Sequence, residues 1–198
     1  MVGVLATLTR LTGVFLAIAL LWEYWADRKK IEVKMLACLV PLVGLGIYMW
    51  YLYSTFGDPL MFVNVQSEFG ADRQTTKLVL LYQVFYRYAK MLMTVPLRSW
   101  TYYQVLLELG SAIFGVFGLA LAYKWVRKSY VWYAGLAFLL PSLTGTFSSM
   151  PRYLLVLFPL FIAVAKIRSK YIRFALLTIF VLLQMINIIL FTQGKWVA

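Results

Sequence analysis

The sequence contains no histidine and a single cysteine, Cys38. Without histidine, the chain cannot build a histidine-ligated metal site or a catalytic triad that depends on an imidazole base. With one cysteine, it cannot form an internal disulfide. Cys38 lies inside an apolar stretch, where a free cysteine usually serves as a small packing residue. These two absences exclude histidine-based chemistry and disulfide crosslinks.

Charge is also scarce, and negative charge is the scarcer kind. Charged residues make up 13% of the 198 positions, and 19 lysines and arginines stand against 7 aspartates and glutamates. In contrast, 63% of the residues are hydrophobic, and the mean hydropathy is +0.82. A soluble domain of this length could not bury so much apolar surface. The composition therefore predicts an integral membrane protein.

The basic residues are distributed in a pattern typical of membrane topology. A net charge of +12 would favour nucleic-acid binding in a soluble protein. Here most lysines and arginines fall in three short clusters between apolar segments, at 28–34, 124–128 and 166–173. Such clusters mark cytoplasmic loops between membrane spans. We therefore expect a membrane partner and no nucleic acid.

Six apolar segments predict an all-α, polytopic membrane protein with about six transmembrane helices. With the basic clusters in the cytoplasm, both ends of the chain and the segment 55–101 lie on the outer face. We expect the protein to lie in the bacterial cytoplasmic membrane and to cross it several times. The predicted spans are 2–25, 35–53, 103–123, 130–147, 153–165 and 174–191.

Residues 77–95 have a different pattern from the six spans. Their polar side chains recur at helical spacing and would form one narrow stripe along a helix. We expect an amphipathic helix on the outer surface, within the outer loop 55–101. A seventh span with its polar stripe facing the other helices is the open alternative. The stripe consists of Thr76, Gln83, Arg87, Lys90 and Thr94.

Two arginines precede apolar segments that are too short to cross a bilayer. The run 153–165 after Arg152 covers roughly 20 Å as a helix, and the run from Arg10 to Trp25 about 22 Å, against about 30 Å of hydrocarbon. Each guanidinium should lie near or below the outer interface, where it needs a partner. Together they could bind a phosphate or diphosphate through bidentate hydrogen bonds. Each could instead bond to backbone carbonyls or reach lipid headgroups.

The outer loop contains a candidate carboxylate, Asp58, in the sequence Gly-Asp-Pro-Leu. This carboxylate could act as a general base on an acceptor hydroxyl or help to hold a divalent cation. The same pattern is typical of a turn, in which aspartate bonds to the nearby backbone and proline restricts φ. Gln66, further along the loop, is a candidate amide for binding a sugar.

Three short segments, in this order, resemble the bacterial relatives of GPI mannosyltransferase II, which are membrane glycosyltransferases of the GT-C type. The segments are Thr-Arg-Leu-Thr-Gly at 9–13, Gly-Asp-Pro-Leu-Met-Phe at 57–62 followed by Gln66, and Ser-Met-Pro-Arg-Tyr-Leu-Leu at 149–155 followed by Phe-Pro-Leu-Phe at 158–161.

The resemblance implies transfer of a sugar from a polyprenyl-phosphate donor to a lipid or glycan acceptor on the outer face. It implies that Arg10 and Arg152 bind the donor phosphate, that Asp58 is the candidate catalytic residue, and that Gln66 and Tyr153 line the substrate cleft. A divalent cation is compatible with this chemistry, but no protein metal site is assigned.

The chain departs from the family in one respect. GT-C enzymes carry an essential acidic residue in an outer loop soon after their first span, and no loop of this chain corresponds to it. We therefore expect residues 1–198 to be a single transmembrane domain and the C-terminal portion of a longer protein. The alternative function is a non-catalytic membrane module that binds or transports an anionic lipid or solute.

Overall fold

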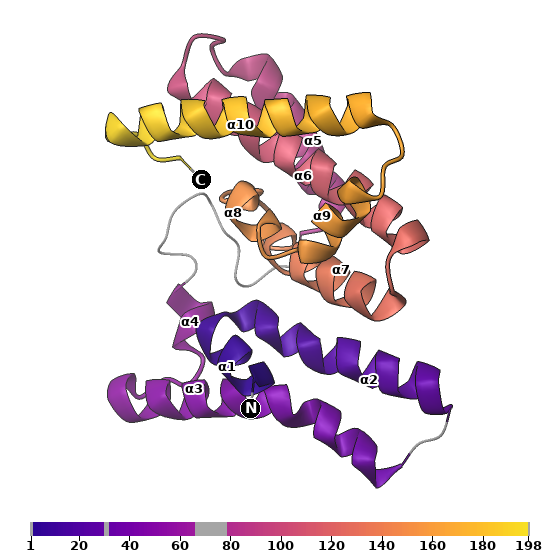
Figure 1. Cartoon of the computed structure of the whole chain (residues 1–198). Coiled ribbons are helices and arrows are strands. Elements are labelled where there is room, and N and C mark those ends of the chain that lie inside the picture. The colour runs from indigo at the N-terminus through magenta and orange to yellow at the C-terminus, as the bar shows by residue number, and fades with distance from the viewer. Residues whose placement is uncertain (1, 30–31, 66–78, 198) are drawn as a thin grey trace. The chain divides into compact units, whose positions relative to one another are not determined.

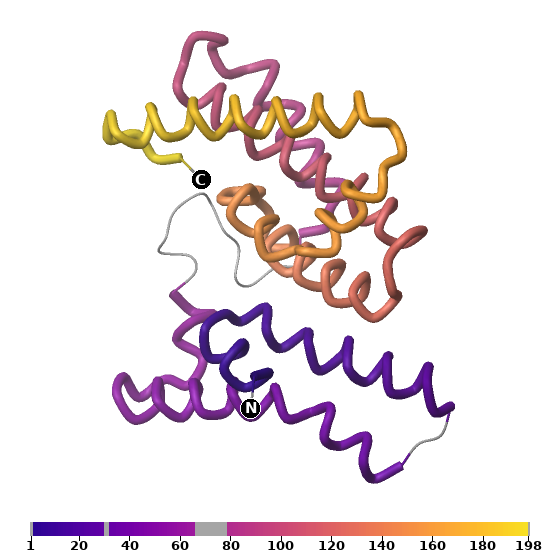
Figure 2. The backbone as a smooth tube through the Cα atoms, in the orientation of Figure 1, coloured from indigo at the N-terminus to yellow at the C-terminus, as the bar shows by residue number. Residues whose placement is uncertain are grey.

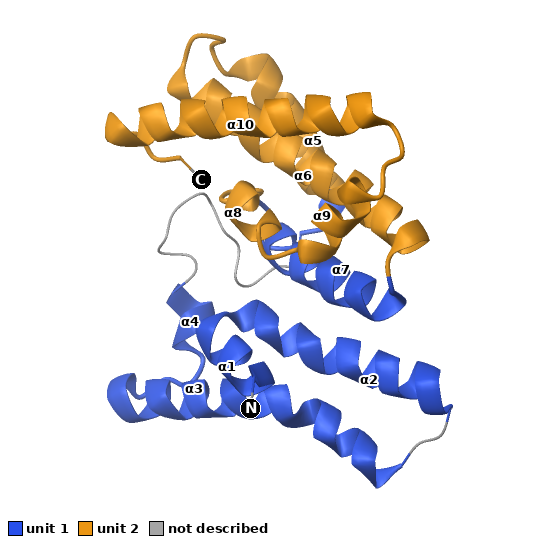
Figure 3. Cartoon of the chain, viewed as in Figure 1, with its two compact units in different colours: residues 1–81, 127–146 blue, residues 82–126, 147–198 orange. Residues whose placement is uncertain are grey.

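The computed structural model describes residues 2–29, 32–65 and 79–197. Every regular element in these ranges is a helix, which confirms the all-α class for this part of the chain. The chain divides into two compact units (Figure 3). Unit 1 comprises Met1–Leu81 and Arg127–Thr146, and unit 2 comprises Tyr82–Val126 and Phe147–Ala198.

The helices of the two units are as follows (Figure 1). Unit 1 contains α1 (Val2–Thr9), η1 (Leu11–Val14), α2 (Phe15–Arg28), η2 (Val33–Leu39), α3 (Val40–Phe56), α4 (Met61–Asn64) and α7 (Lys128–Ser142), where η denotes a 3-10 helix. Unit 2 contains α5 (Leu81–Thr94, from its second residue), α6 (Trp100–Trp125), α8 (Met150–Leu154), α9 (Phe158–Ala165) and α10 (Lys170–Thr192).

Three of the helical segments are long and apolar enough to cross a membrane. They are Val33–Phe56, which joins η2 to α3, together with Trp100–Trp125 and Lys170–Thr192. They coincide with the predicted spans 35–53, 103–123 and 174–191. The part of the chain that the structure describes therefore supports a membrane protein with three candidate spans, and the predicted count of six is not confirmed.

The predicted span 2–25 is wrong as a single helix. α1 ends before Arg10, whose backbone is extended with φ −149° and ψ 135°. The chain then folds back so closely that a Cβ on Gly13 would lie 2.6 Å from backbone atoms of Ala6 (Figure 2). The Thr9 hydroxyl donates to the Ala6 carbonyl. Threonine in this position competes with helical hydrogen bonds, which favours the break.

Prolines interrupt the other two predicted spans. α7 ends at Ser142 rather than at Phe147, because Pro141 lacks an N–H for the helix and Gly145 turns the chain with φ 88°. The segment 153–165 is split into α8 and α9, because Pro159 has no N–H to donate to the Leu155 carbonyl and its ring would clash with that carbonyl in a continuous helix. α7 has 15 residues and α9 has 8. At about 1.5 Å per residue, neither reaches the roughly 30 Å of a bilayer core.

In unit 1, close helix contacts depend on small residues. α1 packs on α3, where a Cβ on Gly44 would lie 2.5 Å from the carbonyl oxygen of Val4. α2 packs on α7, and Trp22 and Trp132 bring their ring centroids within 5.4 Å. Small side chains let helix backbones approach closely, which is how apolar helices associate without water.

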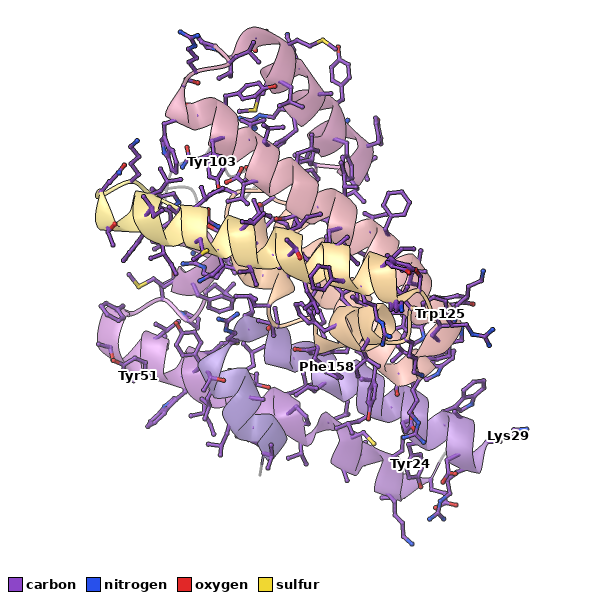
Figure 4. All side chains as sticks on the ribbon, turned by 45° about the horizontal axis from the view of Figure 1, so that its top comes forward. Tyr24, Lys29, Tyr51, Tyr103, Trp125 and Phe158 are labelled. Carbon is purple, nitrogen blue, oxygen red and sulfur yellow. The ribbon has the colours of Figure 1, made fainter. Side chains whose placement is uncertain are left out.

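In unit 2, α6 is the central helix. α8 and α9 pack against it, and Gly118 leaves room for the Leu160 side chain, which would lie 2.8 Å from an added Cβ. α10 contacts α6 through the rings of Phe114 and Phe180, 5.3 Å apart. Tyr103 of α6, labelled in Figure 4, donates to Asn187 Oδ1 of α10. No residue of α10 is buried, as expected for a helix that faces lipid on most of its surface.

The amphipathic helix predicted within 77–95 is confirmed as a helix from Leu81 to Thr94. Its buried residues, Val84 and Tyr88, lie one turn apart on a single face. Gln83, Lys90 and Thr94 of the polar stripe are exposed, and Arg87 is half-buried. Thr76 lies outside the described residues. The location of this helix on the outer surface stays a prediction.

We expect Gly44→Ala to destabilise the protein by about 1–3 kcal/mol, because the new methyl group would collide with the Val4 carbonyl. Gly46 is the matched control, since it lies on the same helix and a Cβ there meets no atom within 4 Å. Gly46→Ala should be neutral or stabilising by up to about 1 kcal/mol. Thermal unfolding in detergent micelles would measure both. Equal midpoints for the two variants would disprove the close contact between α1 and α3.

The three candidate spans and the basic clusters predict opposite locations for two exposed positions, Thr55 and Lys128. In a Cys38→Ser background, Thr55→Cys should react with a membrane-impermeant maleimide on intact cells. Lys128→Cys should react only after the cells are opened. Both side chains are exposed, so burial does not explain a difference. The reverse pattern would refute the topology.

Candidate functional site

Arg152 is exposed on α8, a helix of five residues between two non-helical segments. Its backbone N–H donates to the Ser149 carbonyl at 3.1 Å, and the N–H of Tyr153 donates to the same oxygen at 3.2 Å. No carboxylate of a described residue forms an ion pair with Arg152. A short helix within an apolar unit thus presents a guanidinium that has capacity to bind an anion.

Ser149, the residue that begins this helix, has a left-handed backbone with φ 63°. Its side chain is buried, and Met150 and Phe147 on either side are completely buried. Non-glycine residues adopt this conformation at a cost of about 1–2 kcal/mol and keep it only where the surroundings hold it. The direction in which α8 leaves the turn is therefore determined by a strained residue.

Tyr153, the predicted cleft residue next to Arg152, is half-buried on the same helix. The structure brings these two predicted site residues together, as their adjacency in sequence requires. Gln66, the other predicted cleft residue, lies outside the described residues.

Arg10 lies in unit 1, at the break between α1 and η1. Its side chain is exposed, and its carbonyl accepts the Gly13 N–H at 2.9 Å. Among the described residues no carboxylate forms an ion pair with it. Arg10 lies at a helix break and Arg152 in a five-residue helix, and the two belong to different units, so their convergence on one phosphate stays a prediction.

Polar groups are buried beside the Arg10 break. The Thr12 hydroxyl oxygen is inaccessible to solvent and makes no hydrogen bond within the described chain. Tyr133 of α7 is also buried. Unit 1 thus buries at least two polar side chains, Thr12 and Tyr133.

Asp58 has both carboxylate oxygens engaged in a local turn. Oδ1 accepts the Leu60 N–H at 2.8 Å, and Oδ2 accepts the Asn64 side-chain amide at 2.7 Å. This arrangement matches the turn interpretation of Gly-Asp-Pro-Leu, since an aspartate that bonds to the backbone two residues ahead stabilises such a turn. The catalytic role predicted for Asp58 stays a prediction.

Acidic side chains do not gather into a metal site within the described ranges. No group of three or more Cys, Asp or Glu side chains is suitable for a metal ion among residues 2–29, 32–65 and 79–197. The donor set for a divalent cation is therefore not assigned.

Sequence reasoning missed one residue, Glu108. It is the only carboxylate among the described residues of the three candidate spans, eight residues after Trp100 in α6. Its Oε2 accepts a hydrogen bond from the Tyr88 hydroxyl of α5 at 2.5 Å. The available signal was an acidic residue inside an apolar run, Val-Leu-Leu-Glu-Leu-Gly, because a carboxylate in hydrocarbon is costly without a specific partner.

Comparison with protein-family models, with curated proteins and with solved structures finds no match for this chain. The residues themselves therefore carry the functional argument.

Two substitutions separate the structural and catalytic roles of Asp58. Asp58→Asn retains an oxygen that can accept the Leu60 N–H, whereas Asp58→Ala removes it. If the turn is the main role, the alanine variant should lose about 1 kcal/mol of stability and the asparagine variant much less. Thermal unfolding in micelles would measure this difference. Full stability of both variants together with complete loss of function would indicate catalysis by the carboxylate instead.

Proposed function

We propose that the chain is part of a membrane glycosyltransferase of the GT-C type, which transfers a mannose-like sugar from a polyprenyl-phosphate donor to a lipid or glycan acceptor on the outer face. The observation that carries the proposal is the arrangement of Arg152. Its exposed guanidinium, without an ion-pair partner among the described residues, is presented by a short helix inside a unit that contains two candidate spans.

The chemistry of the donor explains why arginine suits this position. When the sugar leaves a polyprenyl phosphate, negative charge increases on the phosphate oxygens. A guanidinium can donate two parallel hydrogen bonds to such a group, and its planar geometry holds the phosphate in one orientation. In a site with little water, a hydrogen-bonding group such as this guanidinium stabilises the departing phosphate and so accelerates the transfer of the sugar.

The other predicted residues have supporting roles in this proposal. Tyr153 lies beside Arg152 and would contact the donor, while Gln66 would bind a hydroxyl of the sugar or acceptor. Arg10 would provide a second guanidinium for the phosphate. Asp58 is the candidate catalytic carboxylate within this chain, although its turn contacts favour a structural role. The acidic residue that GT-C enzymes carry after their first span would then supply the base.

The alternative is a non-catalytic module that binds or transports an anionic lipid. The engagement of both Asp58 oxygens favours this alternative, because the predicted base then makes only structural contacts. The two functions differ in one outcome: a binding module retains the polyprenyl phosphate but transfers no sugar from it.

Arg152→Lys tests the proposal, because lysine keeps the positive charge but cannot donate the paired hydrogen bonds of a guanidinium. We expect sugar transfer by the full-length protein in native membranes to fall by about two orders of magnitude, with normal insertion. Arg168→Lys is the matched control, an exposed arginine of unit 2 in the basic cluster at 166–173. It should retain transfer.

Three other outcomes would contradict the proposal. Unchanged transfer in Arg152→Lys would remove Arg152 from the phosphate site. Loss of the protein from the membrane would show that the arginine stabilises the fold through backbone carbonyls. Tight binding of a polyprenyl phosphate by the wild type without any transfer would favour the binding module.

A further inference from the structure

The carboxylate of Glu108 and the backbone N–H of Phe147 both bond to the Tyr88 hydroxyl, which thereby connects three segments of unit 2. Glu108 is half-buried in α6, about 12 Å along the helix from Trp100 at 1.5 Å per residue. A carboxylate at this depth is costly unless a neighbour donates to it. Tyr88 of α5 is such a neighbour, with its hydroxyl bonded to Glu108 Oε2.

The Tyr88 hydroxyl acts as donor and acceptor at the same time. While it donates to Glu108, it accepts the backbone N–H of Phe147 at 3.1 Å. Tyr88 is 2% exposed and Phe147 is fully buried, so water cannot replace either partner easily. An unsatisfied backbone N–H in such surroundings would cost about 1–3 kcal/mol. The ring of Phe147 also contacts the rings of Tyr88 and Phe85, at 5.0 and 4.9 Å.

Phe147 in turn holds the turn that leads to Arg152. Its carbonyl accepts the Met150 N–H at 2.9 Å, and the carbonyl of the left-handed Ser149 accepts the Arg152 N–H. The Tyr88 hydroxyl is therefore connected to the start of α8 by consecutive hydrogen bonds and buried rings. A strained turn of this kind persists only when its surroundings hold it.

We infer that Tyr88 and Glu108 are positioning residues for Arg152: the carboxylate orients the Tyr88 hydroxyl, and the hydroxyl holds the Phe147–Met150 turn in the conformation that presents the guanidinium. The expected effect on binding of the donor phosphate rests on the proposed function. The amphipathic helix α5 also has a role in this inference, because its Tyr88 stabilises a turn that lies about 60 residues further along the chain.

The chain offers matched variants for a test. Tyr88→Phe removes the hydroxyl and keeps the ring, while Tyr103→Phe removes a hydroxyl that bonds to Asn187 and lies outside the connection. Glu108→Gln keeps an oxygen that accepts from Tyr88, whereas Glu108→Ala does not. The inference predicts that Tyr88→Phe and Glu108→Ala release the turn, whereas Tyr103→Phe and Glu108→Gln leave it held.

The experiment is hydrogen exchange followed by mass spectrometry on the full chain in lipid nanodiscs. Tyr88→Phe and Glu108→Ala should exchange the amides of residues 147–153 about tenfold faster than the wild type, because the turn opens more often. Tyr103→Phe and Glu108→Gln should leave these amides close to wild type. Unchanged exchange in Tyr88→Phe, or faster exchange throughout unit 2, would overturn the inference.

The second readout is binding of undecaprenyl phosphate to the same nanodiscs. Tyr88→Phe and Glu108→Ala should weaken binding by roughly three- to tenfold, since a smaller fraction of molecules presents Arg152 correctly. Glu108→Gln should restore it. If Glu108→Gln behaves like Glu108→Ala in both readouts, the hydrogen bond is not the cause and the inference fails. Should Tyr88→Phe not fold, the two Glu108 variants decide.

Failure of the proposed function has a different signature. If the wild type does not bind undecaprenyl phosphate, or Arg152→Lys binds it equally well, the donor site is wrong. The exchange rates of residues 147–153 would still show whether Tyr88 and Glu108 hold the turn.

Discussion

The structure depends on one constraint: an apolar chain with few polar side chains must satisfy its backbone N–H and C=O groups internally. Helices do this throughout the described ranges. Where a helix stops, a nearby side chain or carbonyl takes over the hydrogen bonds. The Thr9 hydroxyl donates to the Ala6 carbonyl at the break between α1 and η1, and the Tyr88 hydroxyl accepts the Phe147 N–H between α7 and α8. Polar side chains therefore satisfy backbone groups at these two irregular places.

The same constraint explains why Arg10, Asp58 and Arg152 lie at helix breaks or next to them. Continuous apolar helices use their backbone groups internally and offer little to a ligand, whereas a break exposes a polar side chain at a definite position. Arg10 occupies such a break in unit 1, and Arg152 lies in unit 2 on the five-residue helix α8, which follows one. The left-handed Ser149 and its buried neighbours determine where α8 begins. A guanidinium on a rigid segment loses less conformational entropy when it binds a phosphate, so the entropic cost of binding is smaller.

Several elements were predictable from sequence because their signal is local. The apolar runs at 35–53, 103–123 and 174–191 form long helices, and the polar stripe in 77–95 correctly indicated an amphipathic helix. The breaks at Arg10 and at residues 155–157 were not predicted. Hydropathy measures only how apolar a segment is, and it does not show that a threonine hydroxyl competes for helical hydrogen bonds or that a proline interrupts the helix. Glu108 was overlooked because one carboxylate barely changes the average hydropathy of its segment.

The sequence by itself determined the all-α class and the position of three long apolar helices, because composition and helical periodicity act over short distances. Only the tertiary structure decided that Asp58 closes a turn with Asn64 and that Gly44 admits the backbone of α1. It also decided that Tyr88 joins Glu108 to Phe147, residues 20 and 59 positions away. Hydrogen bonds between distant segments depend on how helices pack, and helix packing follows from shape complementarity that no local pattern encodes.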